Sequence, residues 1–139
     1  MRFLVMVKGN DESEAGVLPE PELFEEMGRF NEELVQAGVL LEAAGLLPSG
    51  QGGVRLSYSG RDRTVTDGPF TEAKELVAGF WIWQVRSKDE AIAWAKRIPF
   101  EGGEVELRRI AEAEDFGEAM SPQVEEQWER LRRQPNVGQ

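Results

Sequence analysis

Apolar and polar positions along the chain predict a mixed fold of strands and helices. Residues 2–8, RFLVMVK, are apolar at both alternating sets of positions, which predicts a strand covered on both faces. The run GNDESEAGVLPEP predicts a loop, after which apolar residues recur at helical spacing over residues 20–37 and stop at Gly38. Residues 39–47, VLLEAAGLL, predict a second strand that ends at the turn-forming run PSGQGG.

The second half of the chain repeats this alternation. Residues 55–66, RLSYS and RTVT around a glycine turn, predict a β-hairpin. Residues 77–85 are again apolar at both sets of positions and predict another doubly covered strand. Ser87 precedes a helical pattern that Pro99 closes, and residues 104–110, EVELRRI, alternate apolar and charged positions as an edge strand does.

This order is β, α, β, a hairpin insertion, then β, α, β, which is the split βαβ pattern of ferredoxin-like α+β folds. We expect an antiparallel βαββαβ sheet with strands 2–8 and 77–85 in the middle. Two helices cover only one face of such a sheet. Another layer must therefore bury one of the two alternating sets of apolar side chains on the strand 77–85, either Trp81 and Trp83 or Phe80 and Ile82.

A second copy of the chain is the cover that we favour, because burial of large apolar side chains stabilises association. The alternative is the C-terminal segment, which predicts a helix from Ser121-Pro122 with Trp128 and Leu131 on one face. We expect one ferredoxin-like domain over residues 1–119 and a helical tail over residues 120–139 that frays at its Pro/Asn/Gly end.

Composition narrows the possible functions. A chain of 139 residues with 40% hydrophobic and 30% charged residues fits one globular domain. No apolar run approaches the roughly 18 residues of a membrane span, and the acidic start does not resemble a signal peptide, so we expect a cytoplasmic protein. A formal charge of −10 argues against binding of nucleic acid, and the basic run RLRR is typical of a solvated helix end.

The chain has no cysteine and no histidine. The first absence excludes disulfides and thiolate nucleophiles, and the second removes the usual general base near neutral pH and the commonest metal ligand. An all-carboxylate metal site needs several converging oxygens, for which the spacing gives no sign. We therefore expect neither a metal nor another cofactor.

The stretch TDGPFTEAKE, residues 66–75, combines a rigid Gly-Pro pair with carboxylates and an aromatic ring. In a structural interpretation Asp67 caps amides of the turn, Phe70 fills the core and Thr71 caps a helical turn. In a catalytic interpretation Asp67 and Glu75 form an acid/base pair beside an apolar wall. Spacing alone favours the structural interpretation. Glu42 also has a functional and a structural interpretation: it points into a cleft, or it faces water at a sheet edge.

These residues resemble a known family. DGPF followed by Glu and by Lys-Glu is similar to DGPFAETKE, the signature of the YciI-like, DGPF-domain family, also called YCII-related. The segments RFLVMVKGNDESEAGVLPE, MGRFNEELVQAGVLL, ELVAGFWIWQV, SKDEAIAWAKRIP and EVELRRIAEAEDFGEA also resemble family text, so the likeness extends to about residue 119. The chain is identified as a member of this family.

The resemblance implies a ferredoxin-like subunit that pairs sheet to sheet into a dimeric α/β barrel, with a cleft lined partly by the DGPF turn. The family's biochemical activity is not established. Two departures matter: Ala73 replaces the threonine of ETKE, and residues 43–48 read AAGLLP where relatives often read GEGLHP. The His-Asp pair proposed as catalytic in the wider YciI group therefore cannot exist in this chain.

Three functions follow as hypotheses. The first is a homodimeric small-molecule-binding or accessory protein. The second is a small enzyme that uses Asp67 or Glu75 as general acid/base on a carbonyl or lactone-like substrate, on fold analogy alone. The third is a structural dimer without a ligand. The expected ligand contacts are Glu42, Asp67, Phe70, Thr71, Lys74 and Trp81.

Overall fold

A computed structural model describes residues 1–134 of the chain, and most of the predicted frayed end lies outside the described residues. The chain divides into two compact units, residues 1–109 and the segment from residue 110 onward. No helix among the described residues combines the length and the apolar character needed to cross a membrane.

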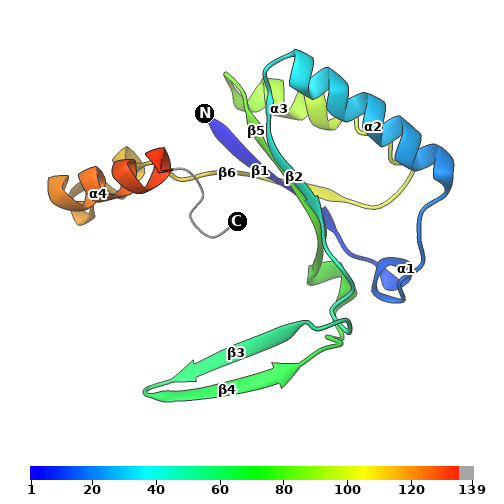
Figure 1. The fold of residues 1–139 in the computed structure, drawn as a ribbon, viewed down its shortest axis with the longest axis horizontal. Helices are drawn as coiled ribbons and strands as arrows, with labels where there is room; N and C mark the ends of the chain where they lie inside the picture. The colour runs from blue at the N-terminus through cyan, green and yellow to red at the C-terminus, as the bar shows by residue number, and fades with distance from the viewer. Residues whose placement is uncertain (135–139) are drawn as a thin grey trace. The chain divides into compact units, whose positions relative to one another are not determined.

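Four antiparallel strands form the sheet of the first unit (Figure 1). They are β1 (Arg2–Lys8), β2 (Leu40–Gly45), β5 (Val77–Gln84) and β6 (Val105–Arg109), in the spatial order β2-β5-β1-β6. The two strands predicted to be central, β1 and β5, are central. The ferredoxin-like α+β fold expected from the sequence is confirmed.

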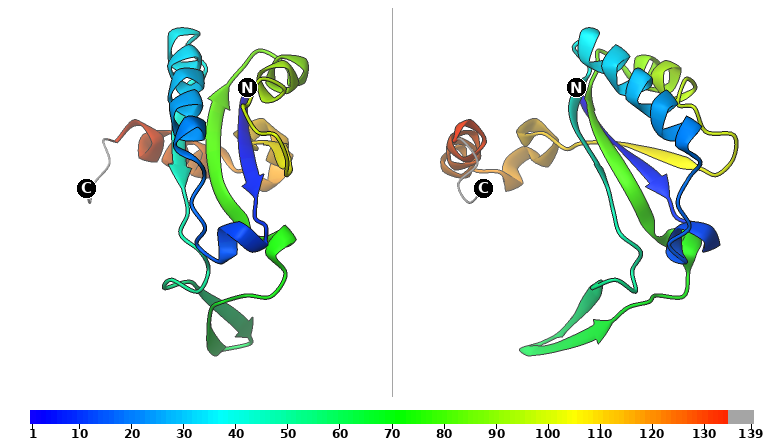
Figure 2. Two further views of the ribbon diagram at one scale, coloured as in Figure 1. Left: turned by 90° about the vertical axis from the view of Figure 1, so that its right-hand side faces the viewer. Right: turned by 45° about the vertical axis from the view of Figure 1, so that its right-hand side comes forward.

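Two helices cover one face of this sheet (Figure 2). The first, α2 (Pro21–Gln36), has Pro at its start and ends before Gly38, whose φ of 72° lies in the left-handed region that a helix stop uses. The second, α3 (Lys88–Ala95), begins at Ser87, whose side chain accepts a hydrogen bond from the Glu90 N–H. The end of α2 and the start of α3 therefore agree with the sequence prediction, whereas α3 ends at Ala95, before the predicted stop at Pro99.

The core lies between the helices and the sheet. Its buried apolar side chains are Phe3, Val5, Phe30, Leu34, Val39, Trp81, Trp83, Val85, Ala91 and Ile98. The indole N–H of Trp81 donates to Asn31 Oδ1 over 2.9 Å, whereas that of Trp83 has no hydrogen-bond partner among the described residues. The sequence left open which alternating set faces the helices, and the structure assigns the two tryptophans to that face.

The opposite face of the sheet, which we call the open face, carries the other set. Leu4 pairs with Ile82 and Met6 pairs with Phe80 across β1 and β5, and all four side chains are only partly buried. No helix of residues 1–109 lies over this face (Figure 2).

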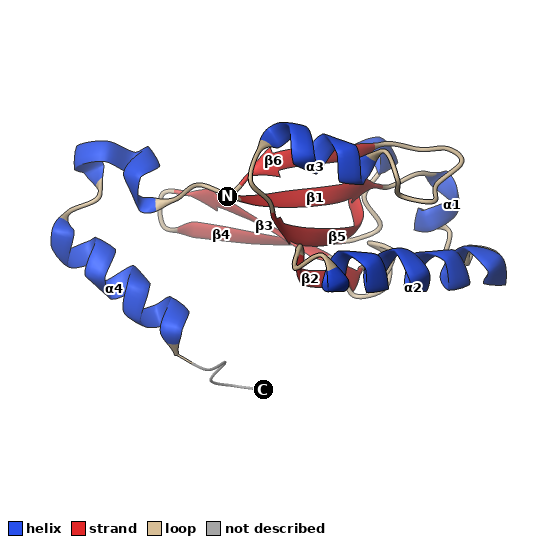
Figure 3. Ribbon diagram, turned by 90° about the horizontal axis from the view of Figure 1, so that it is seen from above, coloured by secondary structure: helices blue, strands red, loops and turns tan. Residues whose placement is uncertain are grey.

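The predicted hairpin is a separate two-stranded ribbon, the arm, made of β3 (Val54–Ser59) and β4 (Asp62–Asp67) (Figure 3). The loop predicted between β1 and α2 contains a short helix, α1 (Asp11–Glu14), which the sequence prediction missed. Asn10 caps it by accepting the Ser13 N–H at 2.8 Å. A 3-10 turn, η1 (Ala73–Glu75), precedes β5.

The second unit contains the 3-10 segment η2 (Ala113–Ala119) and the helix α4 (Pro122–Arg133). Ser121 accepts the Val124 N–H at 3.2 Å, so the predicted helix start is observed. The Trp128 ring packs edge-on against Phe116 with centroids 5.8 Å apart. The predicted domain boundary at residue 119 stays a prediction.

Candidate functional site

The TDGPFTEAKE stretch connects the arm to β5 and passes close to residues 48–53. Gly68 N–H donates to the Gly53 carbonyl over 2.9 Å, and Gly53 N–H donates to the Ser49 carbonyl over 3.1 Å. The Gly68–Pro69 peptide bond is cis. A Cβ atom built on Gly68 would stand 2.0 Å from the Ser49 carbonyl oxygen, so this close backbone approach requires glycine.

Ser49 links three segments of the chain. Its Oγ accepts the Phe70 N–H over 2.9 Å and donates to the Glu14 carboxylate. Its backbone N–H donates to the other oxygen of the same carboxylate over 3.1 Å. We call this arrangement the Ser49 link. It holds the DGPF turn to the loop after β2 and to α1.

The structural interpretation assigned the capping of this turn to Asp67, which was wrong. The group that accepts the Phe70 N–H is the Ser49 hydroxyl, 21 residues earlier in the chain. Neither Ser49 nor Glu14 was predicted as a site residue. They lie 35 residues apart, so no helical or strand spacing relates them.

Replacing Ser49 by Ala is expected to lower the free energy of unfolding by about 1 kcal/mol, because the Phe70 N–H and the Glu14 carboxylate each lose a partner. Faster hydrogen exchange of the Phe70 amide would localise the effect to the turn. Ser57→Ala, at an exposed position of β3, serves as the control and should change stability by less than about 0.5 kcal/mol. Equal effects of the two substitutions would show that the Ser49 link does not stabilise the turn.

The Phe70 ring packs against the arm. The Arg55 guanidinium carbon lies 3.9 Å from the centroid of this ring, in a cation–π contact. Phe70 is half-buried and is not a member of the core cluster, so the interpretation that it fills the core was wrong. This ring instead helps to fix the base of the arm.

The remaining predicted residues of the turn are exposed: Asp67, Thr71, Lys74 and Glu75. Thr71 does not cap the following 3-10 turn, because the cap position is Glu72, which forms no side-chain cap bond. Within residues 1–134, neither Asp67 nor Glu75 forms an ion pair or accepts a side-chain hydrogen bond. The acid/base role of these two carboxylates stays a prediction.

Glu42 and Trp81 lie on opposite faces of the sheet. Glu42 pairs with Ile82 across β2 and β5, and so stands on the open face at its edge. Trp81 belongs to the helix-covered face and is 4% exposed. Glu42 and Trp81 therefore do not line the same surface within a single chain.

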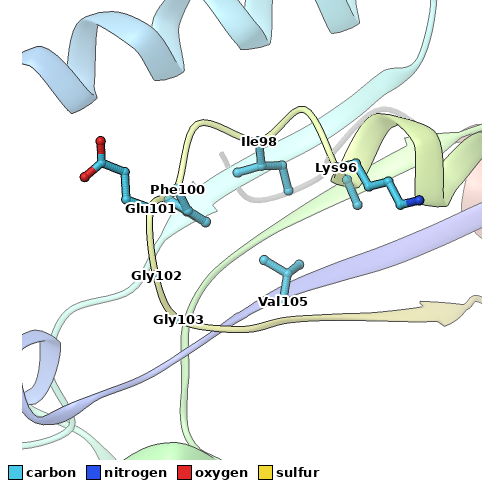
Figure 4. Close-up of a pocket in the computed structure, with 8 residues that line it drawn as sticks. Lys96, Ile98, Phe100, Glu101, Gly102, Gly103 and Val105 are labelled. Carbon is cyan, nitrogen blue, oxygen red and sulfur yellow. The ribbon is translucent and has the colours of Figure 1, made fainter.

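None of the predicted site residues lines either of two shallow hollows on the described part of the chain. The first, of about 250 Å³, lies between the end of α3 and the start of β6 (Figure 4). Ile98 and Val105 point toward one another across it, and Glu101 points away. The second, of about 220 Å³, is lined by Phe30 and charged residues of α2 and by Arg97 and Pro99. Within residues 1–134, no group of acidic residues is placed to hold a metal ion.

Comparison with known proteins gives the following matches. The family model described as YCII-related domain matches residues 1–114. Uncharacterized protein R00369 of Rhizobium meliloti (strain 1021) is 32% identical over 92 residues, which are 64% of this chain and 73% of that protein.

A solved structure is also similar. It is 5-chloro-2-hydroxyhydroquinone dehydrochlorinase (TftG) from Burkholderia phenoliruptrix AC1100 in complex with 2,5-dihydroxybenzoquinone. The match has 16% sequence identity and a TM-score of 0.43, and covers 83% of this chain and 98% of that one.

Proposed function

This chain belongs to the YCII-related domain family, and we propose that it acts as a homodimer that binds a small organic molecule at the seam between two copies. The family membership confirms the resemblance found in the sequence. The observation that carries the proposal is the open face of the sheet.

The open face is apolar at its centre. Leu4, Met6, Phe80 and Ile82 meet there on the two central strands, and each remains partly exposed. A sheet normally buries both apolar faces against another layer, and residues 1–109 supply helices for one face only. A second copy offers the same apolar surface, so pairing of the two open faces would bury both.

The ligand would lie where this interface reaches the edge of the sheet. Binding pockets are mostly apolar and contain a few polar groups that orient the ligand. Phe80 and Ile82 would supply an apolar wall, and Glu42 would supply a polar contact on the same face. The strands β2 and β5 lead from there to the DGPF turn, which would contribute Asp67, Phe70, Thr71 and Lys74. Trp81, in the core, would support the wall from behind through its neighbour Phe80.

Phe80→Glu is expected to convert the dimer into a monomer, because a carboxylate at the centre of the interface would have to be desolvated. Light scattering after size exclusion should give twice the 15.6 kDa of one chain for the wild type and that mass once for the variant. Val35→Glu, at a 61% exposed position on α2, is the matched control and should remain dimeric.

A wild-type chain that stays at 15.6 kDa at micromolar concentration would overturn the homodimer and favour the C-terminal segment as the cover of the open face. Ligand binding has its own test. Native mass spectrometry of protein purified without added ligand should detect a bound small molecule, and less of it in Glu42→Gln. If the dimer carries no added mass and binds no compound from a screen, the ligand-binding hypothesis is excluded and the structural dimer without a ligand remains.

A further inference from the structure

The arm lacks the support that a two-stranded ribbon needs. Every residue of β3 and β4 is exposed, and within residues 1–134 the two strands pair only with one another. A lone two-stranded hairpin is marginally stable at best in water. Contacts at its base, such as Arg55 on Phe70, hold one end only. The rest of the ribbon therefore needs a second surface to pack against.

The strand register separates the arm into two different faces. One face carries the pairs Val54–Asp67, Leu56–Val65 and Tyr58–Arg63, and the other carries Arg55–Thr66, Ser57–Thr64 and Ser59–Asp62. The four apolar side chains all lie on the first face, with exposures of 52% for Val54, 49% for Leu56, 70% for Tyr58 and 62% for Val65. We call it the apolar face of the arm.

The two charged residues of this face lie at its opposite ends and have opposite charges. Asp67 lies at the base of the arm, Arg63 lies near the tip, and the apolar pair Leu56–Val65 lies between them. Isologous pairing of two identical ribbons in antiparallel orientation sets the base of one against the tip of the other. Each Asp67 would then face an Arg63, and the apolar pairs would pack on one another. The pattern is thus complementary to itself.

Both charged groups are available for such a contact. The Arg63 guanidinium is held over the Tyr58 ring at 4.7 Å, and one of its nitrogens, Nη1, donates to the carbonyls of Gly60 and Asp62. Its other nitrogens have no partner among the described residues, and the Asp67 carboxylate has none there either. An arginine that is already fixed in place loses little conformational freedom when it pairs with a carboxylate.

We propose that the apolar face of the arm packs, antiparallel, on the same face of a second copy. This pairing rests on the homodimer proposed above, and the arm extends on the side of the sheet away from α2 and α3, where a copy on the open face would lie (Figure 1). The candidate carboxylate Asp67 then forms an ion pair with Arg63 of the partner subunit. The site at the DGPF turn is built from both chains, and Asp67 is not a free base.

The first test compares two neighbouring positions of the same strand. Leu56→Asp places a charge on the apolar face and should raise the dimer dissociation constant, measured by sedimentation equilibrium, by roughly tenfold or more. Ser57→Asp places the same charge on the polar face and should leave the constant within about threefold, the ordinary range for a surface change. Trp fluorescence checks the sheet in both variants, because the arm contains no tryptophan. Equal effects would overturn the proposal.

The second test is a charge exchange at low salt, where ion pairs are least screened. Asp67→Arg and Arg63→Asp should each weaken the dimer by roughly tenfold, since each places like charges opposite one another twice. The double variant restores opposite charges and should recover wild-type affinity within about threefold. It lacks the Arg63–Tyr58 contact just as Arg63→Asp does, so loss of that contact cannot explain a difference between the two variants. If the wild type dimerises but the double variant does not recover its affinity, the arm contact is overturned and the homodimer is not. A monomeric wild type would overturn both.

Discussion

Replacing Phe30 by Ala is expected to lower the free energy of unfolding by about 4 kcal/mol. The Phe30 side chain is 5% exposed and is the hub of the aromatic core. Its ring centroid lies 6.0 Å from that of Trp81 and 6.3 Å from those of Trp83 and Trp94, in edge-on contacts. Loss of the ring removes its apolar burial and leaves a cavity that three large, rigid indoles cannot close.

Urea denaturation followed by Trp fluorescence measures this effect. The same helix provides the control, because Phe24 is 58% exposed on α2 and its replacement by Ala should change stability by less than about 0.5 kcal/mol. Helix propensity changes equally in the two variants, so the difference between them reports core packing. A difference below about 1 kcal/mol would mean that α2 does not pack on the sheet through Phe30.

Gly68→Ala is expected to destabilise the fold by about 3 kcal/mol, the upper end of the usual cost of overpacking. The new Cβ would stand 2.0 Å from the carbonyl oxygen and 2.7 Å from the carbonyl carbon of Ser49. These are backbone atoms and cannot rotate aside, so the turn and the 48–53 loop must separate. The Gly68–Gly53 hydrogen bond and the Ser49 link would both weaken as a result.

A melting curve followed by circular dichroism checks this result, and a second glycine gives the opposite sign. Gly28 lies within α2, and a Cβ built there meets nothing within 4 Å. Gly28→Ala should stabilise the protein by about 0.5–1 kcal/mol, because alanine favours the helix. If Gly68→Ala melts at the wild-type temperature, the close approach to Ser49 is not a constraint on the fold.

Local sequence patterns determined most of the architecture. The apolar runs at residues 2–8 and 77–85 predicted the two central strands because side chains alternate between the faces of a strand, whatever lies beyond it. Gly38 predicted the end of α2 because the left-handed φ at a helix stop is a property of that one residue. The motif text was sufficient to identify the family.

Tertiary structure decided which of two equally apolar sets of side chains faces the core. Both alternating sets of β5 are apolar, so only the packing of α2 and α3 assigned Trp81 and Trp83 to the core and Phe80 and Ile82 to the open face. The same assignment separates Glu42 from Trp81, which the sequence placed in one candidate site.

The candidate site was the least predictable part of the molecule. Asp67 and Thr71 were natural choices for the caps of the turn because they are its nearest polar residues, yet the hydroxyl that accepts the Phe70 N–H comes from Ser49, and the carboxylate behind it comes from Glu14. Contacts between residues so far apart leave no periodic trace in the chain. The sequence by itself therefore determined the strands, the helices α2, α3 and α4, and the family, because these depend on neighbouring residues; it missed the short helix α1. Only the folded backbone, which brings α1, the 48–53 loop and the DGPF turn together, decided which side chains meet.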